Sequence, residues 1–452
     1  MEKRIVIIGT GPAGLGAANQ LFKKGYQNWA VYDKNDYIGG LAASFVDDKG
    51  FTWDVGGHVV FSHFGYFDKL LVEVLGDKYL SHERESWVWM LNSWVPYPFQ
   101  NNIKFLPREA QLECLLGLLE VYKAGKKETA NFEEWIYSVF GKGIAKYFMI
   151  PYNFKVWATP AKLMQKDWIA ERVSVVDIER VLRNVILDKA DVSWGPNNTF
   201  NFPLHGGTGE IYRKVAERFK DKVHLKKKLV KVNAKEKKVY FEDGTTDKYD
   251  YLVTTAALDQ FTKILRPDNA ELANASEGLH RNSTLIVGIG VEKPLDSNKC
   301  WMYFPQDDSP FYRVTYFSNY SPNNVPGGDT KRYHSQMCEV SYSEHKKESR
   351  EDVIERAIQG LINSKMLEEG DRKKITAKYL LDVPYSYPVP TLTRDAALKK
   401  IQPALEKMDI YSRGRFGAWR YEVGNMDHSL MMGVEIIDRL LEGKPEGVFN
   451  SK

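Results

Sequence analysis

The stretch RIVIIGTGPAGLGAANQLFKK, residues 4–24, opens the chain with an apolar run, a glycine-rich loop and a segment rich in Ala and Leu. Residues 4–8 are mostly β-branched, which predicts a fully buried strand. The segment after the loop predicts a helix from Leu15 to Lys23, and residues 29–32 predict a second strand that ends at Asp33. These elements form a βαβ unit with an acidic residue about twenty residues beyond the glycines.

Each glycine of this loop has a distinct role in binding a dinucleotide. Gly9 permits the tight turn out of the strand, Gly11 lets the backbone approach a pyrophosphate, and Gly14 allows close packing of helix on strand. The N-terminus of the following helix offers N–H groups and a partial positive charge to the phosphates. Asp33 can accept hydrogen bonds from ribose hydroxyls. The loop is therefore predicted to hold the ADP half of a dinucleotide, and the resemblance of later motifs to FAD proteins implies that this dinucleotide is FAD.

Composition argues against several other classes of protein. The 452 residues are 43% hydrophobic and 27% charged, with a net charge of +4 and both signs interspersed, so we expect a globular protein without a nucleic-acid partner. Cys114, Cys300 and Cys338 lie far apart and form no CxxC pair, which predicts a reducing compartment and no metal site. The apolar N-terminal run is too short to span a membrane, so we expect a cytoplasmic protein without a membrane span.

The pattern changes along the chain in a way that predicts several parts. Helical spacing dominates the second hundred residues, and alternating, aromatic-rich stretches follow later. The last amphipathic segment predicts a helix over Met426–Glu442. The predicted fold is α/β in three parts: a discontinuous, Rossmann-like FAD-binding domain (1–85, 204–275 and 404–452), a helical-bundle domain (105–193) and an antiparallel β-sheet domain (86–104, 194–203 and 276–403).

A series of motifs resembles known flavoproteins. GTGPAG, the spacing from Asp33 to Gly39-Gly40 and the C-terminal glycine-and-helix segment resemble the amine-oxidase-like FAD proteins. Further motifs, in order along nearly the whole chain, resemble the UDP-galactopyranose mutases, nearer the eukaryotic type. They are GGHVVFSH (56–63), WVPYPFQNNI (94–103), PYNFKVWA (151–158), WGPNNTFNFP (194–203), KCWMYFP (299–305), PFYRVTYFSNYSP (310–322) and SRGRFGAWRYEVGNMDHS (412–429).

The resemblance implies an isomerase, an intramolecular transferase of galactofuranose biosynthesis. It would interconvert UDP-galactopyranose and UDP-galactofuranose by a reversible ring contraction with no net redox change. The FAD must be reduced, because flavin N5 attacks the anomeric carbon while UDP departs. NADPH is a candidate reductant, and the resemblance leaves an oligomer open.

The resemblance also implies roles for individual residues. Arg172 and Arg313 fall on positions that bind the diphosphate, where a permanent, bidentate cation stabilises the leaving group, and His58 falls beside flavin N5. Arg84 and Ser86 fall on nicotinamide-cofactor positions. The other implied substrate positions are Tyr97, Gln100, Asn153, Trp157, Asn197, Trp301, Tyr303, Tyr387, Tyr421 and Asn425. The implied FAD positions are Gly9, Gly11, Pro12, Ala13, Gly14, Asp33, Gly39, Gly40, Gly57, Val230, Arg415, Gly424, Asn425, Met426 and Ser429.

Two other functions share the nucleotide-binding part of this pattern. A flavin oxidase or desaturase would carry out net redox chemistry on an amine or a lipid, and would predict an apolar tunnel. A Rab-escort or GDP-dissociation-inhibitor protein would share the fold and bind a partner without catalysis. An absorbance spectrum separates the second alternative, because such a protein need not carry a flavin.

Overall fold

The first βαβ unit forms as the sequence predicts, with one change at the start of the helix. The computed structural model describes residues 2–125, 127–169, 173, 176–191 and 198–451. Strand β1 (Ile5–Ile8) is buried along its whole length, and β2 (Trp29–Tyr32) pairs with it in parallel. Helix α1 (Pro12–Lys23) begins earlier than predicted, because Pro12 occupies its first position, where a proline needs no hydrogen-bond acceptor.

The predicted α/β fold is confirmed by a parallel sheet built from distant parts of the chain. Its strand order is β20-β13-β1-β2-β9, with β20 (Ile410–Ser412), β13 (Tyr251–Thr254) and β9 (Val223–His224). The side chains of β1 alternate between two cores: Ile5 and Ile7 pack on one face, and Val6 and Ile8 on the other. Burial on both faces explains why this strand is apolar throughout.

Helices and a small sheet cover the two faces of the parallel sheet. Around Ile5 and Ile7 lie α1, α2 (Gly65–Leu75), α7 (Gly209–Glu217) and α12 (Met426–Glu442). Around Val6 and Ile8 lie α8 (Leu258–Ile264), α9 (Ala270–Ser276), α11 (Arg394–Glu406) and the sheet β12-β11-β10-β14. The strands of that sheet are β10 (Leu229–Asn233), β11 (Lys238–Phe241), β12 (Thr246–Lys248) and β14 (Leu265–Arg266).

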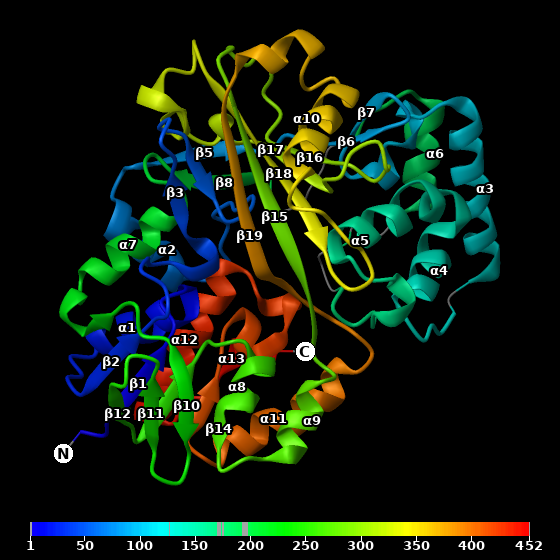
Figure 1. Cartoon of the computed structure of the whole chain (residues 1–452). Coiled ribbons are helices and arrows are strands. Elements are labelled where there is room, and N and C mark those ends of the chain that lie inside the picture. Colours follow the sequence, from blue (N-terminus) through cyan, green and yellow to red (C-terminus); the bar gives the residue numbers. More distant parts are fainter. Residues whose placement is uncertain (1, 126, 170–172, 174–175, 192–197, 452) are drawn as a thin grey trace.

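A long, mostly antiparallel sheet rises from this region through the centre of the molecule (Figure 1). Its order is β19-β15-β18-β17-β16-β6-β7, and only the β16–β6 pairing in that order is parallel. Helix α10 (Val353–Asn363) covers one face. The strands are β6 (Ser86–Met90), β7 (Ser93–Pro96), β15 (His280–Val291), β16 (Trp301–Tyr303), β17 (Arg313–Tyr316), β18 (His334–Tyr342) and β19 (Ile375–Val389).

One segment assigned to this sheet by sequence pairs elsewhere. Strand β8 (Thr199–Pro203) pairs antiparallel with β5 (Tyr79–Glu83), and the two strands form a separate ribbon. A second short ribbon joins β3 (Ser44–Val46) and β4 (Thr52–Asp54). Apart from this pairing, the predicted domain boundaries stay a prediction.

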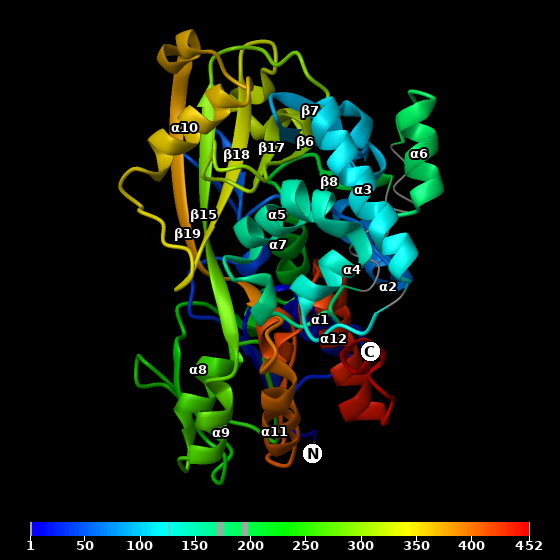
Figure 2. The ribbon, with the colours of Figure 1, turned by 90° about the vertical axis from the view of Figure 1, so that its right-hand side faces the viewer.

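Helices pack on the remaining face of the long sheet and form the outer edge of the molecule (Figures 1 and 2). They are α3 (Arg108–Ala124), α4 (Phe132–Ile144), the π-helical turn η4 (Ala145–Met149), α5 (Ile150–Trp157) and α6 (Ile178–Ile186). Near the C-terminus lie the helical turns η13 (Arg415–Trp419) and η14 (Tyr421–Val423), and the short helix α13 (Gly447–Asn450). Among the described residues, no helix combines the length and apolarity needed to cross a membrane.

Helices α1 and α12 approach each other so closely that only glycine fits at the contact. A Cβ added to Gly433 would lie 1.9 Å from the carbonyl oxygen of Ala13, and one added to Gly16 would lie 2.2 Å from that of Leu430. Both distances are far below van der Waals contact with rigid backbone atoms. The C-terminal helix therefore fixes the position of the helix that follows the glycine loop.

We expect Gly433→Ala to lower the free energy of unfolding by about 1–3 kcal/mol, because the added methyl group forces two helices apart. Urea denaturation measures the change. The matched control is Gly65→Ala, since a Cβ there meets no atom within 4 Å, and it should leave stability unchanged or raise it by up to about 1 kcal/mol. Equal effects of the two substitutions would contradict the close contact.

Candidate active site

The glycine loop has the geometry that a bound pyrophosphate requires. Gly9 adopts a φ of +108°, and a Cβ on Gly14 would lie 1.9 Å from the Gly9 carbonyl oxygen. Gly11 is the N-cap of α1, so the first-turn N–H groups of this helix follow it directly. Gly39, with φ +107°, donates its N–H to Thr10 at 3.0 Å, and a Cβ on Gly40 would lie 3.2 Å from Gly11. The glycine loop and Gly39-Gly40 therefore lie in contact with each other.

Asp33 lies at the C-terminal end of β2 with acceptor capacity left for a ligand. Its Oδ2 accepts from the N–H and the hydroxyl of Thr10 at 2.7 and 2.8 Å, and its Oδ1 accepts from the N–H of Asn35 at 2.8 Å. A carboxylate offers about four acceptor positions. About one therefore remains for a ribose hydroxyl, and the Thr10 hydroxyl can turn away to free another. These features fit the adenosine and pyrophosphate of FAD.

A cavity of about 820 Å³ lies between the parallel-sheet region, α5 and the long sheet. The first residues of α12 and the loop after β4 border it. We call it the central cavity, and it brings together most of the predicted site. The predicted residues that line it are Gly57, His58, Arg84, Tyr97, Gln100, Asn153, Trp157, Trp301, Tyr303, Arg313, Tyr387, Arg415, Tyr421, Asn425 and Met426.

The other predicted residues lie elsewhere. Ser86 is buried on β6 with its hydroxyl 3.4 Å from Nε of Arg84, and Val230 lies on the small sheet. Gly424 accepts a hydrogen bond from Arg415, and Ser429 lies in the first turn of α12. The glycine-loop residues Gly9, Gly11, Pro12, Ala13 and Gly14 lie together with Asp33, Gly39 and Gly40 in the region that we call the nucleotide space. Arg172 and Asn197 lie outside the described residues.

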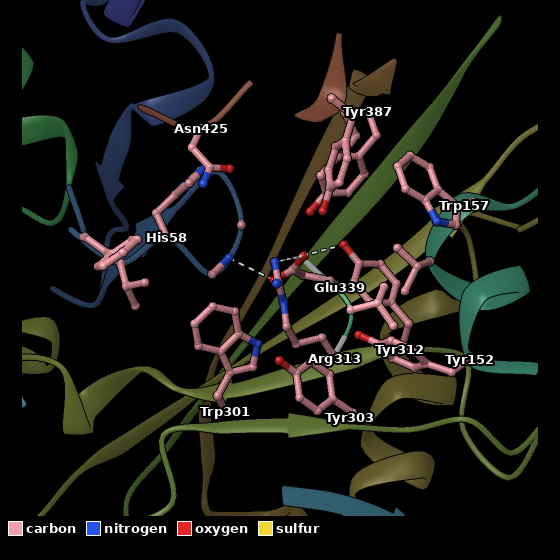
Figure 3. A pocket seen from close by; sticks show the side chains of 18 of the residues that line it. His58, Tyr152, Trp157, Trp301, Tyr303, Tyr312, Arg313, Glu339, Tyr387 and Asn425 are labelled. Carbon is pink, nitrogen blue, oxygen red and sulfur yellow. Dashed lines mark hydrogen bonds and ion pairs between the residues drawn. The ribbon is translucent and has the colours of Figure 1, made fainter. Parts of the chain in front are cut away.

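Arg313 is held in the central cavity by a buried carboxylate, Glu339, which sequence reasoning missed (Figure 3). Its Nε and Nη2 donate to the two oxygens of Glu339 at 2.7 Å each. The N–H of Gly57 donates to Oε1 at 2.8 Å, and the Tyr312 hydroxyl donates to Oε2. Burial alone would raise the pKa of Glu339, but the guanidinium outweighs it and holds that pKa below its ordinary value. The pair is therefore ionised and fixed in orientation.

The sequence around Glu339 contains a pattern that indicates a buried ion pair. Glu339 is the single carboxylate in HSQMCEVSY (334–342), a run whose described side chains are otherwise apolar or neutral and almost all buried. A charge in a buried strand needs a partner. The sheet register supplies it by placing Glu339 opposite Arg313 on β17. Tyr152 and Tyr312, which also line the cavity, were missed although each stands next to a predicted residue.

Aromatic rings form the walls of the central cavity. On one side Trp157 meets Tyr421 edge-on at 4.7 Å between ring centroids, and Tyr387 lies 5.6 Å from Tyr421. On the other side Tyr97 and Tyr303 lie 5.1 Å apart. Trp301 makes cation–π contacts with two arginines: the guanidinium carbons of Arg84 and Arg313 lie 4.4 and 5.0 Å from its ring centroid. The cavity thus combines flat aromatic walls with guanidinium groups that lie against them.

His58 lies on the loop after β4 and lines the central cavity on the side of Asn425 (Figure 3). Gly56, two residues earlier, adopts a φ of +101°, and the N–H of Gly57 is fixed by Glu339. Burial, reinforced by the guanidinium of Arg415, lowers the pKa of His58 to about 4. The imidazole is therefore neutral near pH 7, and its Nδ1 is buried with no hydrogen-bond partner among the described residues.

The same loop is tied to the start of α12. Asn425 is the N-cap of this helix and Met426 its first residue. The buried carboxylate of Asp427 accepts a hydrogen bond from the backbone N–H of His63 at 3.1 Å. It also lies 2.9 Å from Nδ1 of the His63 ring. It also lies 3.0 Å from Nδ1 of His428. These bonds hold the loop and the helix N-terminus together at one edge of the cavity.

Comparison with known proteins gives the class of this chain. The family model described as flavin containing amine oxidoreductase matches residues 12–390. The chain therefore belongs to this flavoprotein family. Within it, the chain groups with UDP-galactopyranose mutase: a crystal structure of the reduced enzyme is 43% identical, with a TM-score of 0.96, over 100% of this chain and 96% of that chain.

Other similarities are more distant or shorter. A putative protoporphyrinogen oxidase from Exiguobacterium sp. 255-15 shares the fold, with 15% identity and a TM-score of 0.73 over 98% of this chain and 100% of that one. Zeta-carotene desaturase of Arabidopsis thaliana is 35% identical over 77 residues, which is 17% of this chain and 14% of the plant protein. The 1-hydroxycarotenoid 3,4-desaturase of Flavobacterium sp. is 48% identical over 54 residues, 12% of this chain and 11% of that protein. The chain thus matches only a small part of these curated relatives.

We expect His58 to titrate near pH 4 rather than at its ordinary pKa of 6.5. Because folding favours the neutral ring, His58 contributes stability that is complete above pH 6.5 and is lost as the pH falls towards 4. Nuclear magnetic resonance of protein labelled at histidine, with His58→Gln to assign the signal, measures the midpoint. A midpoint near 6.5 would contradict the buried environment described for this ring.

Proposed function

We propose that the chain catalyses the interconversion of UDP-galactopyranose and UDP-galactofuranose with reduced FAD. The observation that carries the proposal is the fixed Arg313–Glu339 pair, which aims a guanidinium into an aromatic-walled cavity beside the nucleotide space. Similarity to the reduced mutase along the full chain supports it. Such a cavity is suited to a diphosphate that joins a flat base to a sugar.

Arg313 is the residue that we propose to stabilise the diphosphate. Glu339 occupies Nε and Nη2, so Nη1 remains to donate to a phosphate oxygen. Because the side chain is already oriented, it needs no reorganisation as negative charge grows on the leaving UDP. Arg172 is proposed as the second diphosphate ligand on the resemblance of its motif.

The polar and aromatic residues of α5 and η2 (Phe99–Asn101) suit the uridine end. Asn153 donates its amide Nδ2 to the Met149 carbonyl oxygen at 2.7 Å, which leaves its own oxygen to accept from the uracil N3–H. Gln100 and Tyr97 lie on the same side of the cavity. We propose that Trp157, Tyr387 and Tyr421 border the sugar with Trp301, Tyr303 and Asn425, and that Asn197 adds an amide.

Reduced FAD, when bound, supplies the nucleophile for the anomeric carbon. The glycine loop and Asp33 would hold its ADP half, and the N-terminus of α12 would stabilise negative charge on its pyrimidine edge. His58 is neutral, so it adds no positive charge beside the reacting atoms. The fixed N–H of Gly57 keeps the loop that carries His58 in one position.

NADPH is the reductant that we propose for this flavin. Arg84 borders the central cavity, where it can reach a cofactor phosphate, and the buried Ser86 hydroxyl orients its Nε.

Cytoplasmic location and a part in galactofuranose biosynthesis stay predictions from the sequence. A carotenoid desaturase, the alternative, needs an apolar tunnel, whereas Arg84, Arg313 and Arg415 line this cavity.

Activity should depend on the redox state of the flavin. Dithionite-reduced protein should convert UDP-galactofuranose to UDP-galactopyranose with no net oxidation of flavin, whereas oxidised protein should be inactive. Chromatography of the UDP-sugars, with the flavin absorbance recorded in parallel, measures both. Reduced, FAD-loaded protein that leaves the substrate unchanged would overturn the proposal. Oxidised flavin that the substrate reduces, one equivalent per product, would indicate an oxidase or desaturase.

Loss of the Arg313 guanidinium should lower kcat/KM by about 10²–10³-fold, as expected when a fixed electrostatic group is removed. Arg313→Ala also leaves Glu339 buried without a partner and so destabilises the fold. The double variant Arg313→Ala/Glu339→Gln removes that charge and should regain stability without regaining activity. Arg332→Ala, at an exposed ion pair with Glu292, is the matched control. Recovery of activity in the double variant would show that Arg313 acts only on folding.

A further inference from the structure

Asn282 is a buried amide that joins two walls of the central cavity. It is fully buried on β15, and it is not among the described residues that line the cavity. Its Nδ2 donates to the carbonyl oxygen of Val156 on α5 at 2.8 Å, and its Oδ1 accepts from the backbone N–H of Tyr387 on β19 at 2.9 Å. The amide therefore bonds to the main chain of two elements that are distant in sequence and border the same cavity.

The bond to Val156 falls at the C-terminal end of α5, where a helix needs partners from outside. The last four carbonyl groups of a helix have no hydrogen-bond donor within it. In α5 the long sheet supplies two of these donors. The Ser341 hydroxyl of β18 donates to the carbonyl oxygen of Lys155, and the amide of Asn282 donates to that of the next residue. Val156 directly precedes Trp157, whose ring lines the cavity, so this bond fixes the main chain beside that ring.

The bond to Tyr387 falls at an irregularity of the long sheet. Asn282 pairs with Tyr387 across β15 and β19. The next pair of the two strands joins Thr284 to Val383, so that one residue of β15 faces three residues of β19, 384–386. Such a bulge bends a strand and changes the direction of the side chains beside it. Tyr387 directly follows the bulge and lines the cavity, so the direction of its ring depends on what holds its backbone.

The rings beside these two bonds contact each other (Figure 3). Trp157 and Tyr387 meet edge-on with their ring centroids 5.9 Å apart. Because an amide group is planar, its donor and its acceptor keep a fixed separation. The single side chain of Asn282 therefore sets the distance between the main chains that carry the two rings.

We propose that Asn282 is a positioning residue, which sets the gap between Trp157 and Tyr387 and so determines how tightly the sugar of a UDP-sugar is held. The inference rests on the proposed function, which places both rings beside the sugar. Asparagine suits this position because its side chain offers both a donor and an acceptor. A carboxylate would lack the donor for Val156, and an apolar side chain would lack both groups.

Asn282→Ala removes both bonds and should raise the Kd for UDP-galactopyranose at least about tenfold, with a similar loss in kcat/KM. A displacement of about 1 Å that begins away from the reacting atoms can cost about 10²-fold in catalysis. Isothermal titration calorimetry of the FAD-loaded protein measures the Kd without turnover. A parent protein that binds the UDP-sugar but does not convert it would therefore contradict the proposed activity alone.

The matched control is Asn324→Ala. Asn324 is equally buried, donates its amide Nδ2 to the carbonyl oxygen of Phe317 at 2.8 Å, and is not among the described residues that line the cavity. The control should lose comparable stability in urea and keep the parent Kd. A Kd for Asn282→Ala that equals the Kd of the control would overturn the proposal.

A double-variant cycle shows whether Asn282 acts through the aromatic gap. Tyr387→Ala removes one of the two rings, so no gap remains to be set. In that background Asn282→Ala should raise the Kd by a clearly smaller factor than in the parent, because the effects of residues that act through one another are not additive. Equal factors in the two backgrounds would show that Asn282 does not act by positioning Tyr387.

Discussion

The buried carboxylate of Glu339 organises the centre of this molecule. A carboxylate has about four acceptor positions, and all four are used: two by Arg313, one by the Tyr312 hydroxyl and one by the Gly57 N–H. Burying an ion is costly unless its hydrogen bonds are complete. This site meets that condition with donors from β17, from Tyr312 directly before it and from the loop after β4. One anion thus fixes the direction of a cation and the path of a backbone loop together.

Asp33 shows the opposite use of the same functional group. Three of its acceptor positions are filled by Thr10 and Asn35, which position the carboxylate, and the remaining capacity faces the nucleotide space. A saturated carboxylate supports structure, whereas an unsaturated one can bind. The number of acceptor positions that protein donors fill therefore distinguishes the roles of Glu339 and Asp33.

Local chemistry allowed much of this fold to be predicted from the sequence. The strand Trp29–Tyr32 and the helix Met426–Glu442 form with the expected bounds, because burial and periodicity decide them within a short stretch. The start of α1 was predicted three residues too late, because Pro12 is tolerated at the first position of a helix. The partner of β8 and the role of Glu339 could not be found in this way, since both follow from the register of strands distant in sequence. Motif resemblance found most of the substrate-position residues that line the cavity, without showing what holds them in place.

The contact between α1 and α12 has a consequence for the order in which the chain can fold during synthesis. Proteins emerge from the ribosome with the N-terminus first, yet the glycine loop at the start of this chain rests on a helix that ends at Glu442. The helices that follow residue 107 have local contacts and can form early. The nucleotide space, by contrast, is completed only when the segment up to Glu442 has been released. Cofactor loading therefore follows the synthesis of α12, when the chain has already built the walls of its cavity.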